Sequence, residues 1–456
     1  MSDIEEIEVE TTTSKRNVFF WAMYDLANTI YSMVIVNLII NRYVLVIGQV
    51  EYGMSYGSVS FLYGVVALVM QVAVAICIPI LGALSDNVGK RKPFVISLTG
   101  IILLFASLIG FYHDLSIVIL FFIIANVAYQ FSLMFYDAML PFIAKREDIG
   151  KVAGFGVVWG YFGTILSLFI MMPLILSVGD MNSDPTQGAL SYGYTGNWFS
   201  FVLPMILFLV CAIPFIWVRE KQKKNKRPPI GKLIGNTFKQ LGGTFKDIRK
   251  HKSMFIFIIG YFFVADIANV IVLYMTPLVT DGLIIGTGGT SSTTFAILFI
   301  IIATFSAVIF TYFVGKFGKK YGAKKTFYLV GVLWALALII GIVLIFTTPY
   351  IEVGANIPFI FSLIMGLIAG PALGGTWTAQ RIMVTELAPT EKFGEFFGFS
   401  KLSGKLSSAI GPFIWGTVML TYDVIGKAAY GWAMISVGII MGIGIFILSF
   451  VQKESL

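Results

Sequence analysis

Apolar residues fill this chain in long uninterrupted runs, separated by short polar connections. Runs of about 20 residues, the length that a helix needs to cross a hydrocarbon core of ~30 Å, recur twelve times. They cover 18–47, 58–84, 93–112, 115–143, 152–178, 198–218, 254–280, 292–317, 325–347, 356–384, 393–421 and 428–451. We therefore predict an all-α integral membrane protein with twelve transmembrane helices, an even number that returns both termini to one side.

Composition supports this class and excludes others. Hydrophobic residues make up 57% of the chain and charged residues only 12%, which excludes a soluble fold. The two cysteines, Cys77 and Cys211, lie inside apolar runs and predict neither a disulfide framework nor a metal site. ATP-binding, zinc-protease and dinucleotide-binding motifs are absent from the sequence, so we expect no enzyme and no cofactor.

Positive charge predicts the orientation in the membrane. The net charge is +8, but 27 of the 32 basic residues lie in the tails and in alternate connections and four lie within spans, whereas the opposite connections hold only Lys427. By the positive-inside rule both termini are cytoplasmic, in a plasma membrane or a vacuole-type membrane. Because the basic residues are not gathered on one soluble surface, nucleic acid is not an expected partner.

The connections divide the chain into five parts. We predict a tail (1–17), a six-helix bundle (18–218), a basic linker (219–253), a second six-helix bundle (254–451) and a short tail (452–456). The linker holds twelve basic residues and apolar residues at helical spacing, which predicts a solvated connector with an interfacial amphipathic helix. A regulatory lipid-binding role for the linker is the alternative.

Three segments repeat between the two predicted bundles. Residues 25–28 (DLAN) match 266–269 (DIAN) at an offset of 241, and the basic loops after spans 2 and 8 match at 233. Five identities link 147–160 with 391–404 at 244. Each pair occupies the same place within its half, so we predict pseudo-symmetric parallel repeats about an axis along the membrane normal.

Several motifs resemble those of known transporters. The loop 82–92 (GALSDNVGKRK) is similar to the signature loop of the major facilitator superfamily. Residues 24–28 (YDLAN), 135–141 (FYDAMLP) and the segment 395–412, from EFFG to GP, resemble the autophagy-related vacuolar amino-acid effluxer family and its prokaryotic relatives. This resemblance implies the major facilitator fold and efflux or exchange of amino-acid-like solutes.

The chain departs from that family at three places. Leu26 stands in place of a usual Trp, Asp137 in place of an Asn, and Trp377 in place of a Gln. The last two lie on spans 4 and 10, which in this superfamily face the central cavity. The departures therefore bear on the substrate and not on the fold.

Charged residues inside the spans are the first candidates for function, because each costs roughly 2.5–3.5 kcal/mol to insert. Asp25 shares a polar helix face with Asn28, and Asp266 with Asn269 repeats the arrangement. We predict substrate or ion binding by these four residues, with Asp25 as a proton or cation site or the partner of a substrate ammonium. The alternative is a fixed acceptor that holds two helices together.

Spans 4, 10 and 11 supply further candidates. Asn126, Gln130 and Trp377 are predicted to line the substrate site. Lys401 and Lys405 share one face of span 11. Lys401 is expected to reach the membrane surface. Lys405 lies too deep for that and is predicted to bind a carboxylate, with a structural ion pair as the alternative.

Two sets of charges are predicted to control conformation. Asp137 and Arg381 occupy equivalent positions of the repeat and carry opposite charges, which predicts an ion pair that closes the cytoplasmic gate in the outward-facing state. Unrelated side chains reaching the surface are the alternative. As the superfamily resemblance implies, Asp86, Lys90 and Arg91 would hold their loop against a neighbouring helix end in one state.

We thus predict a monomeric secondary active transporter that moves amino acids or similar zwitterions by alternating access, driven by a solute, proton or other ion gradient. The alternatives are a carrier of organic anions or other small solutes, or a non-transporting membrane receptor or scaffold. The polar faces of spans 1, 7 and 11 favour the transporter.

Overall fold

A computed structural model describes residues 14–88, 90–144, 149–178, 198–220, 239, 242–243, 245–283, 292–347, 357–388 and 393–452. The regular structure in these ranges is helical throughout. The helices of the first half are α1 (Lys15–Ile30), η1 (Tyr31–Ile39), α2 (Ile40–Val50), α3 (Tyr56–Val88), α4 (Lys92–Ile109), α5 (Leu115–Ala138), α6 (Leu140–Ile143), α7 (Ile149–Val178), α8 (Phe199–Ala212) and η3 (Ile213–Trp217). Those of the second half are α10 (Lys252–Pro277), η4 (Leu278–Leu283), α11 (Ser292–Tyr321), α12 (Ala323–Thr347), α13 (Ile357–Leu387), α14 (Phe393–Met419), α15 (Tyr422–Ile425) and α16 (Ala428–Ser449).

Each of the twelve predicted spans coincides with one long helix or with helices that follow one another directly. Within the described residues, ten of these segments are long and apolar enough to cross a membrane. The other two are α7, whose apolar described stretch covers Gly154–Ile170, and α14, which carries Lys401 and Lys405. The prediction of an all-α membrane fold is confirmed.

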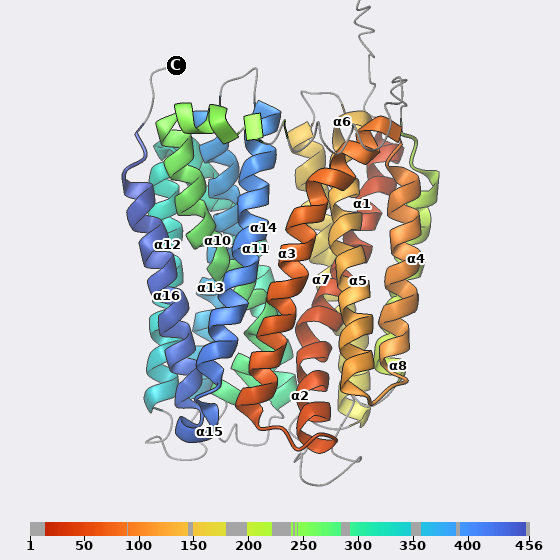
Figure 1. Cartoon of the computed structure of the whole chain (residues 1–456), viewed down its shortest axis with the longest axis vertical. Coiled ribbons are helices and arrows are strands. Elements are labelled where there is room, and N and C mark those ends of the chain that lie inside the picture. Colours follow the sequence, from red (N-terminus) through yellow and green to blue (C-terminus); the bar gives the residue numbers. More distant parts are fainter. Residues whose placement is uncertain are drawn as a thin grey trace, which may run out of the picture.

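The helices form two groups that stand side by side (Figure 1). In the first half α1 packs against α7 and α8, and α4 packs against α5. In the second half α13 packs against α11 and α12, and α10 packs against α14 and α16. Each group is therefore held together by helix–helix contacts of its own, and one buried apolar cluster continues through both groups.

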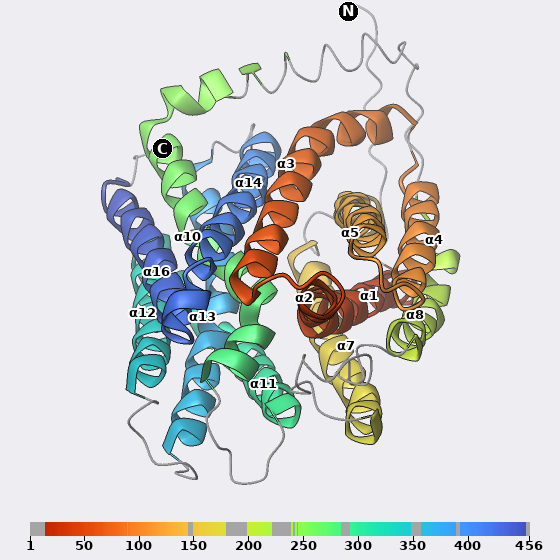
Figure 2. The ribbon, with the colours of Figure 1, turned by 60° about the horizontal axis from the view of Figure 1, so that its bottom comes forward.

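The two groups meet along α3 and α14, which lie side by side in Figure 2. Small residues allow this close approach. A Cβ atom at Gly64 of α3 would lie 2.7 Å from the carbonyl oxygen of Pro412 on α14, and one at Gly416 would lie 3.0 Å from that of Ser60. Larger side chains at these positions would push the halves apart.

The two ends of the bundle differ in the elements they carry. One end, the α6 end, holds α6 and the C-terminal ends of α3 and α5, and it lies at the top of Figure 1. The opposite end, the α15 end, holds α2 and α15. The basic loops lie at the α6 end, which the positive-inside rule predicts to be cytoplasmic.

The predicted amphipathic helix of the linker lies largely outside the described residues. Of its described part, 245–250 is helical. Phe245 packs on Phe255 and Phe399, with ring centroids 6.1 and 5.9 Å apart, and Ile248 is fully buried. This part of the linker is docked on α10 and α14 through its apolar side chains.

Candidate substrate site

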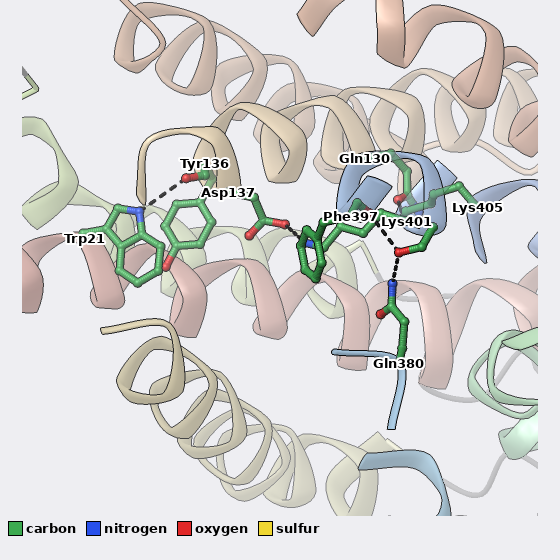
Figure 3. A network of polar contacts seen from close by, with 9 residues as sticks. Trp21, Gln130, Tyr136, Asp137, Gln380, Phe397, Lys401 and Lys405 are labelled. Carbon is green, nitrogen blue, oxygen red and sulfur yellow. Dashed lines mark hydrogen bonds and ion pairs between the residues drawn. The ribbon is translucent and has the colours of Figure 1, made fainter. Parts of the chain in front are cut away.

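An ion pair joins the two halves near the α6 end. Lys401 of α14 lies 3.0 Å from a carboxylate oxygen of Asp137 on α5, as Figure 3 shows. The side chains are 45% and 55% exposed. The long side chain of Lys401 thus reaches across to the opposite half near this end of the bundle.

A second contact between the halves lies deeper in the bundle. Lys405, one turn from Lys401 on α14, donates a hydrogen bond from Nζ to the side-chain oxygen of Gln130 on α5. Gln130 and Asp137 are seven residues apart, which places both on the same face of α5. Two predicted site residues, Gln130 and Lys405, are therefore brought together, and the ammonium has a neutral amide as its partner.

A buried amide that the sequence analysis did not single out completes the cluster in Figure 3. Gln380 of α13 donates from Nε2 to the hydroxyl of Ser400 at 2.9 Å, and Ser400 in turn donates to the carbonyl of Phe397 at 2.9 Å. Gln380 is nearly fully buried. These bonds fix the start of α14 against α13 just before Lys401.

Arg381 does not pair with Asp137 in this structure, where Asp137 is bound to Lys401. The Arg381 side chain is exposed, and within the described residues it has no carboxylate at ion-pair distance. The gate between Asp137 and Arg381, which was predicted for the outward-facing state, stays a prediction.

A charge-swap experiment distinguishes the two possible partners of Asp137. Asp137→Arg should lower transport at least about tenfold, because it places like charges beside one another. If Arg381 closes the gate, adding Arg381→Asp should restore at least half of the transport rate, whereas adding Lys401→Asp should not. Uptake into proteoliposomes measures both. Rescue by Lys401→Asp and not by Arg381→Asp would show that Arg381 does not pair with Asp137 to close the gate.

Asp25 faces α7 at two glycines. A Cβ atom at Gly156 would lie 3.1 Å from Oδ2 of Asp25, and one at Gly160 would lie 3.7 Å from its Cγ. Among the described residues, no hydrogen bond or ion pair engages the Asp25 carboxylate. Asn28, one turn later, is 1% exposed, and both of its amide atoms lack a partner. The predicted polar face is therefore present. Among the described residues, the Asn28 amide and the Asp25 carboxylate on this face have no hydrogen-bond partner.

The repeat of this motif in α10 has a different environment. Asp266 accepts a hydrogen bond from the backbone N–H of Gly411 at 2.9 Å. Asn269 donates to the carbonyl oxygens of Ala265 at 3.0 Å and Gly404 at 3.4 Å. Both side chains thus bind the backbone where α10 packs on α14, which favours the structural alternative for Asp266 and Asn269.

The remaining predicted site residues lie apart from the ion pair. Asn126, one turn before Gln130 on α5, is buried and donates to the sulfur of Met70 at 3.1 Å. Trp377 of α13 is 41% exposed. Asn126 extends the polar face of α5 toward the middle of the bundle.

The first basic loop is held against the end of η3. The backbone N–H groups of Arg91 and Lys92 donate to the Glu220 carboxylate at 2.8–3.0 Å, and the Arg91 guanidinium lies 3.6 Å from it. Lys90 is exposed, and Asp86 falls outside the residues whose side chains are described. Arg91 therefore ties this loop to Glu220, which follows η3, and the role of Asp86, Lys90 and Arg91 in one conformational state stays a prediction.

The second loop repeats this arrangement with a shifted register. Lys92 Nζ donates to carbonyl oxygens at the end of η3 at 2.6 and 3.0 Å, and Lys324 Nζ donates to those at the end of α16 at 2.6 and 2.9 Å. These equivalent contacts relate Lys92 to Lys324, an offset of 232, whereas the two loops match in sequence at an offset of 233. Only Gly322, with φ of +86°, separates α11 from α12, so the second turn is tighter.

Comparison with known proteins places the chain in a family. A family model described as vacuole effluxer Atg22 like matches residues 41–455. The chain belongs to the Atg22-like family. It is 26% identical over 445 residues to an uncharacterised MFS-type transporter, YxiO, of Bacillus subtilis (strain 168), which covers 95% of this chain and 94% of the relative. An uncharacterised protein of Aquifex aeolicus (strain VF5) is 23% identical over 398 residues, with 87% of each chain covered.

Solved structures show the fold of this Atg22-like chain. The nucleoside transporter NupG, as its D323A mutant, superposes with a TM-score of 0.70 at 14% identity, covering 96% of this chain and all of NupG. A D-xylose-proton symporter gives 0.67 at 14% identity, with 96% and 98% covered. These structures show the fold alone. Membership of the Atg22-like family, together with this fold, makes the chain a multi-pass membrane transporter of the major facilitator type and not an enzyme.

At the α15 end, charged and aromatic residues join the halves of the Atg22-like transporter. Arg42 of α2 lies 3.5 Å from Asp281 of η4, with side chains 10% and 11% exposed. Tyr56, at the start of α3, donates to Asp281 at 2.8 Å and also bonds the hydroxyl of Tyr430 on α16. The sequence analysis missed this cluster, because Asp281 lies in a connection and Arg42 in an apolar run.

A further contact between the halves lies deeper in the bundle than that cluster. Thr276 of α10 donates from its hydroxyl to the carbonyl oxygen of Asn37 in η1 at 2.6 Å. Both residues are buried. The α15 end is therefore closed by buried contacts between the halves, while the Asp137–Lys401 pair at the α6 end is about half exposed.

Proposed function

We propose that this Atg22-like transporter moves small solutes that carry a carboxylate, amino acids or similar zwitterions, by alternating access. The observation that carries the proposal is Lys405, an ammonium in the middle of α14 whose partner is the neutral amide of Gln130. A partly buried cation without a bound carboxylate keeps its charge for a substrate carboxylate. The family description, vacuole effluxer, supports efflux of a small solute as the activity.

The arrangement of the gates supports the alternating-access part of the proposal. The contacts among Arg42, Asp281 and Tyr56 seal the α15 end, and those around Asp137 and Lys401 leave the α6 end half exposed. With the basic loops in the cytosol, these contacts support a state that opens toward the cytoplasmic side. Alternating access then requires the α15 contacts to break and the α6 contacts to tighten.

Asp25 is our proposed proton site, because its carboxylate lies inside the membrane, faces two glycines and has no hydrogen bond among the described residues. Asp25→Asn should abolish amino-acid accumulation that depends on a pH gradient while leaving saturable exchange without a gradient. Paired uptake assays in proteoliposomes, with and without a gradient, measure this. An Asn variant that retains gradient-dependent accumulation would disprove proton coupling through Asp25.

The same assay tests the rival functions. A receptor or scaffold would show no saturable uptake by the unmodified protein. A carrier of other small solutes would show uptake of organic anions but none of amino acids. Saturable amino-acid uptake that an excess of unlabelled substrate suppresses is the result that the proposal requires.

A further inference from the structure

Gln71 of α3 carries a buried polar atom to which the account above gives no role. Its side-chain oxygen Oε1 is buried and has no hydrogen-bond partner among the described residues. An amide oxygen can only accept hydrogen bonds, and a buried acceptor without a donor is unfavourable. The sequence analysis did not single out Gln71, because a single amide inside an apolar run carries no charge. Its oxygen is free to accept a hydrogen bond from a ligand.

The packing of α3 on α14 sets the level of Gln71 in the bundle. A Cβ atom at Gly64 would lie 2.7 Å from the carbonyl oxygen of Pro412. One at Gly57, seven residues earlier, would lie 2.6 Å from the carbonyl oxygen seven residues after Pro412. The two helices are antiparallel, so steps of seven residues run in opposite directions along them. The next step leads to Gln71 on α3 and to Lys405 on α14.

A contact with α5 places the same turn of α3 beside the substrate site. Asn126 donates to the sulfur of Met70, the residue before Gln71, at 3.1 Å. Asn126 lies one turn before Gln130 on α5, and Gln130 accepts the hydrogen bond from Lys405 that Figure 3 shows. The registers of α5 and of α14 therefore agree, and both place Gln71 at the level of the contact between Gln130 and Lys405.

Resting on the proposed function, we infer that Gln71 binds the amino group of the substrate while Lys405 binds its carboxylate. The ammonium group of an amino acid brings hydrogen-bond donors only, and Oε1 of Gln71 is an acceptor without a donor. A neutral amide suits this role, because an acidic residue at position 71 would pair with Lys405 and compete with the substrate carboxylate. Gln71 thus selects amino acids over carboxylic acids that lack an amino group.

The same arrangement links substrate binding to the movement of the halves. Gln71 belongs to the first half and Lys405 to the second. A zwitterion held by both residues joins the halves through its two charged groups. A solute that lacks the amino group binds the second half alone and lacks this connection, so it shifts the population of conformational states less.

Pairs of solutes that differ only in the amino group test the inference on the purified full-length protein. The pairs are alanine and propionate, norvaline and pentanoate, and phenylalanine and hydrocinnamate. Calorimetric titration at one pH and ionic strength should give a Kd about tenfold lower for each amino acid than for its acid. Equal or tighter binding of the acids overturns the inference and leaves carboxylate binding by Lys405 intact. Absence of binding by all six solutes overturns both.

A leucine variant assigns the selectivity to its residue. Gln71→Leu should raise the Kd of the amino acids about tenfold and leave that of the acids within about twofold, so that the preference is lost. Gln452→Leu, the same substitution at an exposed residue after α16, is the matched control and should keep the preference. The melting temperature of each ligand-free variant checks folding. A Gln71→Leu protein that keeps the preference, or that loses affinity equally for both kinds of solute, would show that Gln71 does not bind the amino group.

A second variant keeps the size of the side chain and tests the position of Gln71. The carboxylate of Gln71→Glu should occupy Lys405 and raise the Kd of propionate, pentanoate and hydrocinnamate at least about tenfold. Unchanged binding of these acids by the folded variant would place Gln71 away from Lys405 and overturn the inference.

Discussion

Lys405→Gln should weaken amino-acid binding about 30- to 100-fold, equivalent to about 2–3 kcal/mol. The reason is that Lys405 supplies the buried positive charge to which we assign the substrate carboxylate, and its partner Gln130 is neutral. A glutamine at position 405 can still bond to Gln130 through its amide, so the packing of α5 against α14 should survive. Titration of the purified variant with the best amino acid measures the loss.

Lys316→Gln is the control for this variant. Lys316 is exposed on α11, and its Nζ atom lies 4.7 Å from the centroid of the Tyr312 ring. It changes the same charge by the same substitution outside the site. We expect its affinity to match that of the parent protein. A Lys405→Gln protein that binds within about threefold of the parent would mean that Lys405 is only a structural residue.

Asp281→Ala should open the α15 end by removing the acceptor that Arg42 and Tyr56 share. Loss of one partner from a buried ion pair costs about 3 kcal/mol, which would shift the ratio of the two conformational states roughly 100-fold. Asp281→Asn keeps an acceptor for the Tyr56 hydroxyl but removes the charge. We expect it to have an intermediate effect.

A cysteine at position 63 reports this opening. Tyr63 of α3 is buried against Tyr274 of α10 across the interface, and their ring centroids are 6.0 Å apart. Tyr63 lies about two turns after Tyr56 on α3, toward the middle of the bundle. In a Cys77→Ser, Cys211→Ser background, Tyr63→Cys should react slowly with a membrane-impermeant maleimide applied to intact cells. Asp281→Ala should raise the labelling rate at least about tenfold. An unchanged rate would mean that the cluster around Asp281 does not hold this end closed.

The hydrophobic pattern was sufficient to predict the fold. Each predicted span coincides with one long helix or with helices that follow one another directly, because a lipid-exposed run of apolar residues must satisfy its backbone hydrogen bonds internally. Depth along a helix also identified Lys405 and Gln130, which the fold then brings into contact. These inferences depend on local properties of the chain that the bundle does not change.

The sequence could not predict which side chains pair between helices. Lys401 and Asp137 are 264 residues apart, and Arg42 and Tyr56 meet Asp281 only after the halves assemble. The repeat was also misleading in one respect. Asp25 and Asp266 match in sequence, but Asp266 accepts a backbone N–H from α14 while Asp25 faces bare glycines of α7. The duplication preserves the sequence motif, but the packing of each half determines which contacts the residues of the motif make.

Counterflow in proteoliposomes tests the central claim, alternating access with an amino-acid substrate, most directly. Vesicles loaded with unlabelled amino acid and diluted into a trace of the labelled form should take up label transiently above equilibrium, without any ion gradient. The Lys405→Gln protein should show a strongly reduced overshoot at the same protein density. Equal, non-saturable uptake by empty and loaded vesicles, identical in the parent and the variant, would contradict the account.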